Sequence, residues 1–567
     1  MFEDILYYSS LLGCVILGSY YKKIDDVVAK RNYGAGLGIL VTCFICGHYV
    51  FHSVFLVWGN VVAIKCCDMR YVHQFSLAFS WIYLMYMHYH AECSEYVIWL
   101  HQTLALRLVG LAFEIHIADR TKTDLNSGAA NDDEEAMKLK PSASDIISYA
   151  YFFIGIHKGP YYTWKTFNEH FNTPFRSLGD CRVITEQKLK KAFLCSVGYW
   201  MLQMNFPLEV YNDRDFYDNY GSDYRFISNM PRLIMYFFKY QIIMMLCTSI
   251  CTETGFGVYP AKCMPTPGHG PTTEFSLLKM AAGSPEVALQ QEYNFAMLKC
   301  FDNQKLVMGP KMKDTVRGWD MPTRYWFWTY TYKNMVKSNS TVRSAVSFMA
   351  WTIWAGSSKK EVIVALTLWV YIHLETEYAA MYDAGSLKGA WAIGFTIMRI
   401  LCLIYLTPCF VIADADQAIN YYRSIYWAYH ILLIVLTVVA AALYKAGHQP
   451  RMSSSGGKPF PPRPKEILDA GKVPSSANIV GAAKDIAKNM AAPGAAMNKA
   501  VNATESTIAN AASQSSNKNS GPTKSGTDKA GGTDKPSGTD KPDGTGRTNR
   551  PDNPGGPSTS LNAERKN

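Results

Sequence analysis

Two long stretches without a single charged residue constrain this chain more than any other feature of its sequence. They cover residues 34–64 and 73–90. A helix needs about 20 apolar residues to cross a bilayer, so the second suits one span, while the first predicts two short helices or one broken helix. Other apolar segments predict further membrane helices, at residues 1–21, 97–117, 191–206, 231–251, 321–336, 342–355, 361–378 and as a pair between 390 and 444. The sequence therefore predicts an all-α, polytopic membrane protein with roughly ten to eleven spans.

The chain divides into a predicted membrane domain, residues 1–446, and a polar tail, residues 447–567. Hydrophobic residues make up 49% of the chain and aromatic residues 13%, yet the mean hydropathy is only -0.06 because the tail dilutes an apolar body. The tail is rich in Gly, Ser, Thr and Lys and repeats the string Gly-Thr-Asp-Lys. It has too few large apolar residues to offset the conformational entropy lost on folding, so we predict that it is disordered.

Charge and cysteine content argue against several other classes of protein. The formal net charge is +10, but the basic tail lacks the Arg clusters and interleaved aromatic residues of a nucleic-acid-binding segment. Most of the 14 cysteines lie in or beside apolar segments, where cysteine usually serves as a small hydrophobic residue. Cys43 and Cys46 have CxxC spacing but fall within such a segment, so we predict no disulfide framework and no metal site. A transporter is disfavoured because no paired half-repeats are evident.

The stretch 317–377 carries the strongest local signal. It opens on an aromatic segment that contains Trp319-Asp320-Met321, and the apolar run that follows ends in Trp354-Ala355-Gly356. The stretch resembles the signature core of the membrane-bound O-acyltransferase superfamily, most closely its lysophosphatidylinositol acyltransferase branch. Members of that family carry Trp-Asn-Met and Trp-His-Gly at these places, with the same separation of 35 residues (355 − 320). Further segments similar to the branch lie at residues 159–167, 206–210, 255–260 and 422–430.

The resemblance implies a fold, a location and substrates. It implies a helical membrane protein of the endoplasmic reticulum that remodels phosphatidylinositol acyl chains, with acyl-CoA as co-substrate, a lysophospholipid as acceptor, and no cofactor or metal. It also implies that the family's histidine is the general base and its asparagine a positioning partner. Those roles fall on Ala355 and Asp320. A methyl group cannot accept a proton, and losing one proton-transfer group typically removes ~10²–10⁴ in rate.

Two functional hypotheses follow from this substitution. The first is a lysophospholipid acyltransferase whose mechanism is displaced or weakened. The second is a catalytically inactive family member that binds lipid or acyl-CoA as a sensor or as a partner of an active relative.

Asp320 itself allows two interpretations. A carboxyl in an apolar chamber is pushed toward its neutral form, so Asp320 could have taken over as a weak base. Asp is also a good N-cap, and Asp320 directly precedes Met321-Pro322, where proline suits the first turn of a helix. The capping interpretation is the simpler one.

Several other residues are candidates for the site. Substrate-binding candidates are Trp319, Tyr325, Trp328, Trp354 and His373. Tyr325 and Trp328 also fit a plain stripe of core or interfacial aromatic residues at helical spacing. His373 and His430 lie in apolar segments, where a histidine is a functional hypothesis by default. His373 could replace the missing base, whereas the resemblance gives His430 a counterpart of its own in the family. Lys239, Glu253, Arg343 and Arg399 are expected to reach the membrane surface or line a wet cavity.

Overall fold

The computed structural model describes residues 2–125, 140–179, 181–334, 339–382 and 388–448, which belong to one compact unit. The predicted all-α class is confirmed. Within these ranges the strands are one antiparallel pair of two residues each, β1 (Tyr259–Pro260) and β2 (Tyr293–Asn294). The prediction of a disordered tail concerns residues that, from 449 onward, lie outside the described ranges.

The predicted apolar segments form helices, and several are longer than their hydrophobic patterns. The uncharged stretch 34–64 is a broken pair, as predicted, with a 3-10 turn between its two helices. The N-terminal helices are α1 (Phe2–Lys22), α2 (Val27–Cys46), α3 (Val50–Cys66), α4 (Val72–His90) and α5 (Glu95–Leu125). The following segment forms α6 (Ala143–Ala150), α7 (Trp164–Asn172), α8 (Cys181–Asn205), α9 (Arg214–Asn219), α10 (Ser222–Ile227) and α11 (Asn229–Thr254).

The second half alternates short and long helices. Short helices cover the polar stretch before the aromatic segment: α12 (Phe275–Gly283), α13 (Pro285–Leu289), α14 (Asn303–Met308) and α15 (Met312–Gly318). The remaining helices are α16 (Met321–Phe327), which continues into a π-helical turn (Trp328–Tyr332), α17 (Ser340–Ala355), α18 (Lys359–Tyr382), α19 (Lys388–Val411), α20 (Ala415–Ser424) and α21 (Ala428–His448).

Several helices can cross a membrane by length and composition. Within the described ranges, four such segments are Val27–Cys66, Glu95–Thr121, Ser222–Thr254 and Gly389–Val411, and a fifth arises if α20 and α21, bent by 70°, count as one. The chain is therefore a multi-pass membrane protein. The predicted number of ten to eleven spans stays a prediction, because helices such as α1 and α8 have the length of a span but are not among these segments.

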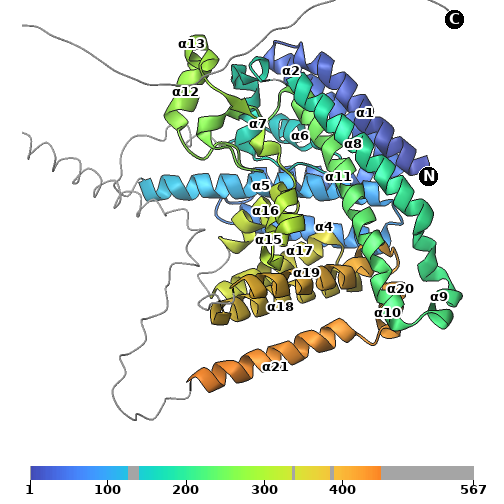
Figure 1. Ribbon diagram of the computed structural model, residues 1–567. Coiled ribbons are helices and arrows are strands. Elements are labelled where there is room, and N and C mark those ends of the chain that lie inside the picture. Colours follow the sequence, from blue (N-terminus) through green and yellow to red (C-terminus); the bar gives the residue numbers. More distant parts are fainter. Residues whose placement is uncertain (1, 126–139, 180, 335–338, 383–387, 449–567) are drawn as a thin grey trace, which may run out of the picture. The chain divides into compact units, whose positions relative to one another are not determined.

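Helix α5 forms the centre of the larger hydrophobic core. Figure 1 shows it crossing the middle of the helical body, and its central residues are almost all buried. Arg107, in the middle of α5, is fully buried and donates to the carbonyls of Ala150 (2.9 Å) and Phe152 (2.8 Å), and also to that of Ile154. This one guanidinium therefore satisfies the carbonyls of the irregular segment after α6.

The same segment passes unusually close to α2. A Cβ added at Gly38 would lie 1.5 Å from the carbonyl oxygen of Tyr151, so only glycine allows this approach. The Phe153 amide donates to the Gly34 carbonyl at 3.1 Å, which fixes the contact.

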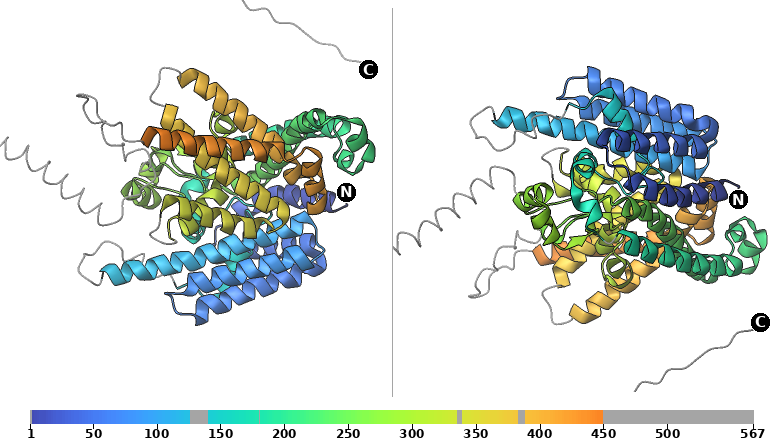
Figure 2. Two further views of the ribbon diagram at one scale, coloured as in Figure 1. Left: turned by 90° about the horizontal axis from the view of Figure 1, so that it is seen from below. Right: turned by 90° about the horizontal axis from the view of Figure 1, so that it is seen from above.

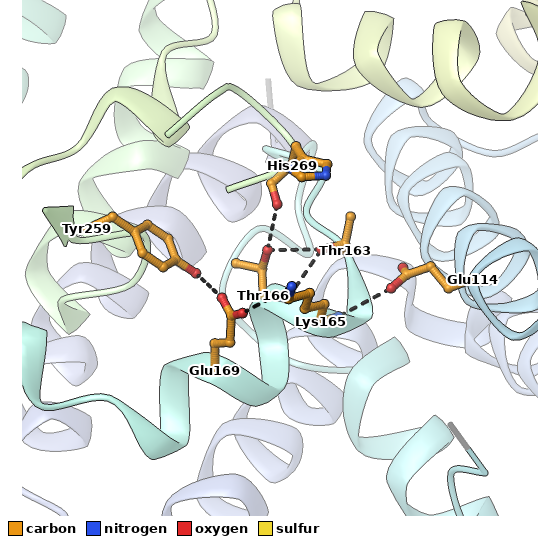
Figure 3. A network of polar contacts seen from close by, with 7 residues as sticks. All are labelled: Glu114, Thr163, Lys165, Thr166, Glu169, Tyr259 and His269. Carbon is orange, nitrogen blue, oxygen red and sulfur yellow. Dashed lines mark hydrogen bonds and ion pairs between the residues drawn. The ribbon is translucent and has the colours of Figure 1, made fainter. Parts of the chain in front are cut away.

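A polar network anchors α7 next to α5 (Figure 3). Glu114 of α5 accepts the first amides of α7, from Trp164 at 2.9 Å and Lys165 at 3.3 Å. Thr166 donates to the carbonyl of His269 at 3.2 Å. A carboxylate at a helix N-terminus satisfies amides that have no partner within the helix, so the network fixes where α7 begins.

A second hydrophobic cluster is formed largely by α18–α21, on the side of the unit opposite α2–α5 (Figure 2). Arg399 of α19 ties this cluster to the short helices, donating to the Leu306 carbonyl at 2.6 Å and to the Thr315 hydroxyl at 2.9 Å. We expected Arg399 to reach the membrane surface or a wet cavity. That expectation is wrong, because the residue is only 1% exposed and its charge is held by backbone carbonyls.

Candidate active site

Asp320 lies at the start of α16, after Trp319. Its backbone is left-handed, with φ 37° and ψ 62°, a region that Asp enters more readily than most residues. Its side chain lies close to the amide and the hydroxyl of Thr323, the residue whose amide a capping residue would use, but the geometry is not that of a capping hydrogen bond. One carboxyl oxygen, Oδ1, is buried without any hydrogen-bond partner. The cap and the functional interpretations of Asp320 therefore both stay open.

A lysine lies near this carboxyl. Burial raises the pKa of Asp320, and the charge of Lys158 opposes that rise. Burial likewise lowers the pKa of Lys158 to about 8, against the opposing effect of Asp320. The Lys158 ammonium lies 4.1 Å from the centre of the Trp99 ring, so a cation–π contact replaces part of its lost hydration.

Aromatic rings enclose the region around Asp320. Trp319 stacks on Tyr236 of α11, with ring centres 5.9 Å apart and planes 9° from parallel, and its ring centre lies 4.8 Å from that of Phe301. Tyr240, one turn further along α11, lies 5.7 Å from Trp319 and 5.4 Å from the Lys158 ammonium. Trp319 is thus part of an aromatic wall beside the two ionisable groups.

Ala355 is the last residue of α17, and α5 holds it in place. The Trp354 indole donates to the Gln102 carbonyl at 3.2 Å, and the Gln102 amide donates back to the carbonyls of Trp354 (3.0 Å) and Ala355 (3.3 Å). Ala355 is partly buried against the larger core. Its methyl group offers no hydrogen-bonding atom at this place.

Asp320 and the end of α17 border the same region of the core. Tyr236 lies within electrostatic reach of both Asp320 and Glu361. Glu361 in turn lies directly against Gly356, since a Cβ added there would be 3.1 Å from its carboxyl carbon. Tyr236 is therefore within electrostatic reach of Asp320 and of the carboxyl that lies against Gly356, the residue after Ala355.

Tyr325 and Trp328 lie on a less buried face than their neighbours. The π-helical turn shifts the helical register, and the buried residues are Trp326, Phe327 and Tyr330. The ring centre of Tyr325 lies 5.5 Å from that of His269, and Lys333 places its ammonium 3.8 Å from the ring centre of Trp328. The structure does not bring either residue to Asp320 by any described contact, and their role in substrate binding stays a prediction.

The histidines His373 and His430 lie elsewhere. His373 contacts the Ser344 hydroxyl at 3.3 Å, about three helical turns before Ala355 on α17. His430 has partners on both ring nitrogens, the hydroxyls of Thr367 and Tyr405, within the second cluster. Because both nitrogens are satisfied, His430 has the environment of a structural residue.

Two residues near these positions were not predicted from the sequence: Lys158, and a different histidine, His88 of α4, which lies beside the backbone of Ala355. Each carried a usable signal, because an ionisable residue within an apolar segment suggests function. The sequence alone could not single out these two residues among the other histidines and lysines, since only folding brings Lys158 near Asp320 and His88 near Ala355.

The fold and this site define a class of protein: a multi-pass helical membrane protein with ionisable groups enclosed by aromatic side chains in its core. The sequence model of the membrane-bound O-acyltransferase family matches residues 125–413, about half of the chain and all of the stretch that holds Asp320 and Ala355. The chain belongs to this family.

Curated relatives match over most of their length. The membrane-bound acylglycerophosphatidylinositol O-acyltransferase mboat7 of Xenopus laevis is 26% identical over 468 residues, 79% of this chain and 96% of the relative. The protein of the same name from Homo sapiens, MBOAT7, is 23% identical over 82% of this chain and 99% of its own length. The Drosophila melanogaster protein frj, which carries the same activity in its name, is 22% identical over 77% and 92%.

Proposed function

We propose that this protein transfers an acyl chain from acyl-CoA to the free hydroxyl of lysophosphatidylinositol, in the membrane of the endoplasmic reticulum. The family membership and the activity named for the relatives support the reaction class and the acceptor.

One observation carries the proposal: a carboxyl and an ammonium, Asp320 and Lys158, are both partly buried and lie within electrostatic reach of each other beside a group of aromatic rings. Ionisable groups inside a membrane domain are costly and mark functional sites. Acyl transfer develops negative charge on the thioester oxygen and needs a preorganised, water-free partner for it. Lys158 supplies positive charge in this region, and Asp320 occupies the place of the family's positioning asparagine.

The test is an acyl-transfer assay on purified protein in lipid, with acyl-CoA and a choice of lysophospholipids. We expect acylation of lysophosphatidylinositol above the other acceptors. Asp320→Ala should lower turnover by about 10²-fold or more, because the polar partner at this place is lost, whereas Asp320→Asn restores the family's amide and should keep activity. Asp416→Ala is the matched control, since that carboxylate is exposed and pairs only with the surface residue Lys359. Full activity of a folded Asp320→Ala protein would contradict the proposal.

The alternative is a binding protein without turnover, and the methyl group of Ala355 is the observation that favours it. In that case the unaltered protein would bind acyl-CoA without transferring the chain. The double variant Ala355→His with Asp320→Asn would then gain activity, because it rebuilds the family's base and its partner together.

A further inference from the structure

Two hydrogen bonds align α4 with α17 side by side. The Trp81 indole donates to the Ala350 carbonyl at 2.8 Å, and the Tyr89 hydroxyl donates to the Ser357 carbonyl at 2.8 Å. Both helices therefore run in the same direction, and position 88 of α4 is level with Gly356. His88 lies two helical turns after Trp81 and so faces the same side.

One nitrogen of the His88 ring is held and the other is free. Nδ1 lies 2.6 Å from the Leu84 carbonyl, which can only accept, so this nitrogen carries the proton of the neutral ring. Nε2 then carries a lone pair. It is buried next to the Ala355 carbonyl and makes no hydrogen bond of ordinary geometry. An imidazole nitrogen that carries a lone pair is able to accept a proton.

The surroundings of His88 stabilise the ring once it has taken up a proton. The Ala355 carbonyl lies next to the ring, and the Glu361 carboxylate is within electrostatic reach. Glu361 is itself fixed, since it accepts the amide of Ser358 at 3.1 Å. A protonated ring would therefore donate to the carbonyls of Leu84 and Ala355 beside a negative charge, which is what a general base requires after it has removed a proton.

Resting on the proposed function, we infer that His88 is the proton acceptor of this protein and supplies from α4 the imidazole that position 355 of α17 lacks. Nε2 takes the proton of the acceptor hydroxyl as its oxygen attacks the thioester carbonyl and a C–O bond forms. The tetrahedral intermediate then breaks its C–S bond. The proton passes from His88 to the departing thiolate, so the products are acylated lipid and free CoA thiol.

The decisive variant is His88→Asn, because the asparagine amide can keep the bond to the Leu84 carbonyl but has no group in the place of Nε2. We expect kcat to fall by about 10²-fold or more while KM for the lysolipid changes by less than about threefold. The matched control is His101→Asn on α5. His101 has the same backbone bond, from Nδ1 to the Val97 carbonyl at 2.7 Å, and the same buried, unpartnered Nε2, but its neighbouring titratable group is His52 of α3. It should retain full kcat.

A rescue variant separates chemistry from structure. Introducing Ala355→His into the His88→Asn protein should raise its kcat by about tenfold or more, because an imidazole returns to the same region from α17. His88→Gln is a second variant in case His88→Asn does not fold, and it should show the same loss. Three outcomes would overturn the inference and leave the proposed function standing. They are a wild-type kcat in either folded His88 variant, an equal loss of kcat in His101→Asn, and a loss of kcat that Ala355→His does not recover. An unaltered protein without any turnover would overturn both.

Discussion

Lys158 bears a partly buried positive charge that the fold stabilises incompletely. Burial lowers its pKa to about 8, while the unfolded chain keeps the ordinary value of 10.5. At pH 7 the lysine is charged in both states, so folding has to desolvate the charge. Lys158→Met keeps the apolar stem over Trp99 and removes the charge, and we expect a more stable protein at pH 7, by on the order of 1–3 kcal/mol. The measurement is the melting temperature in detergent.

The stability advantage of Lys158→Met should depend on pH in a defined window. Folded protein loses the Lys158 proton near pH 8 and unfolded chain only near 10.5, so the unfolded chain binds more protons between these values. The stability of the unaltered protein therefore rises relative to the variant across this window, and the advantage disappears. Lys239→Met is the control, because Lys239 shares the Trp99 ring but pairs with Glu95 at a partly exposed place. If the difference in melting temperature between Lys158→Met and the unaltered protein did not change with pH, the lowered pKa of Lys158 would not be its cause.

Position by position, the site was only partly predictable from the sequence. The motif spacing led to Asp320 and Ala355, because the residues that flank them, Trp319 and Met321 or Trp354 and Gly356, resemble the family's motifs. It could not find His88, whose place beside Ala355 depends on how α4 aligns with α17. It also proposed His373, whose neighbour Ser344 lies about three turns away from Ala355.

Among the elements, α5 depends most on a single side chain. Replacing Arg107 by methionine would leave the carbonyls of Ala150, Phe152 and Ile154 buried and without partners. We expect a loss of about 3–5 kcal/mol, because each unpaired buried carbonyl costs about 1–3 kcal/mol and the effects overlap. Reduced yield and a lower melting temperature in detergent would show it.

Arg120→Met provides the control for this prediction, because Arg120 lies on the same helix and is exposed. Equal melting temperatures for the two variants would show that the hydrogen bonds of Arg107 to the backbone carbonyls do not stabilise the fold.

The sequence shows a charged residue, Arg107, within the apolar segment 97–117, but it does not show the acceptors of that residue, since these are backbone groups more than forty residues away. Helix existence was predictable from the hydrophobic pattern, whereas the π-helical turn at Trp328–Tyr332 was not, because it depends on packing.

For the whole molecule, the helical class and the family could be predicted, because apolar length and motif register are properties of the sequence alone. The number of membrane crossings could not. Composition does not distinguish a helix that crosses lipid from one buried in protein. Helix α5 is long and apolar enough to cross a membrane, yet almost all of its apolar segment is buried within the protein.

The described residues, which end at 448, belong to one compact unit, which makes the independence of that unit testable. A chain ending at Arg451 should keep its melting temperature and its turnover, because residues 452–567 have too few large apolar side chains to add a stabilising core. A chain ending at Ser424 is the matched truncation. It removes Tyr429 and Leu433, both buried in the second cluster, at about 1.5–3 kcal/mol each, and should melt at a lower temperature. A stability loss in the first truncation as large as in the second would mean that the tail contributes to the folded unit.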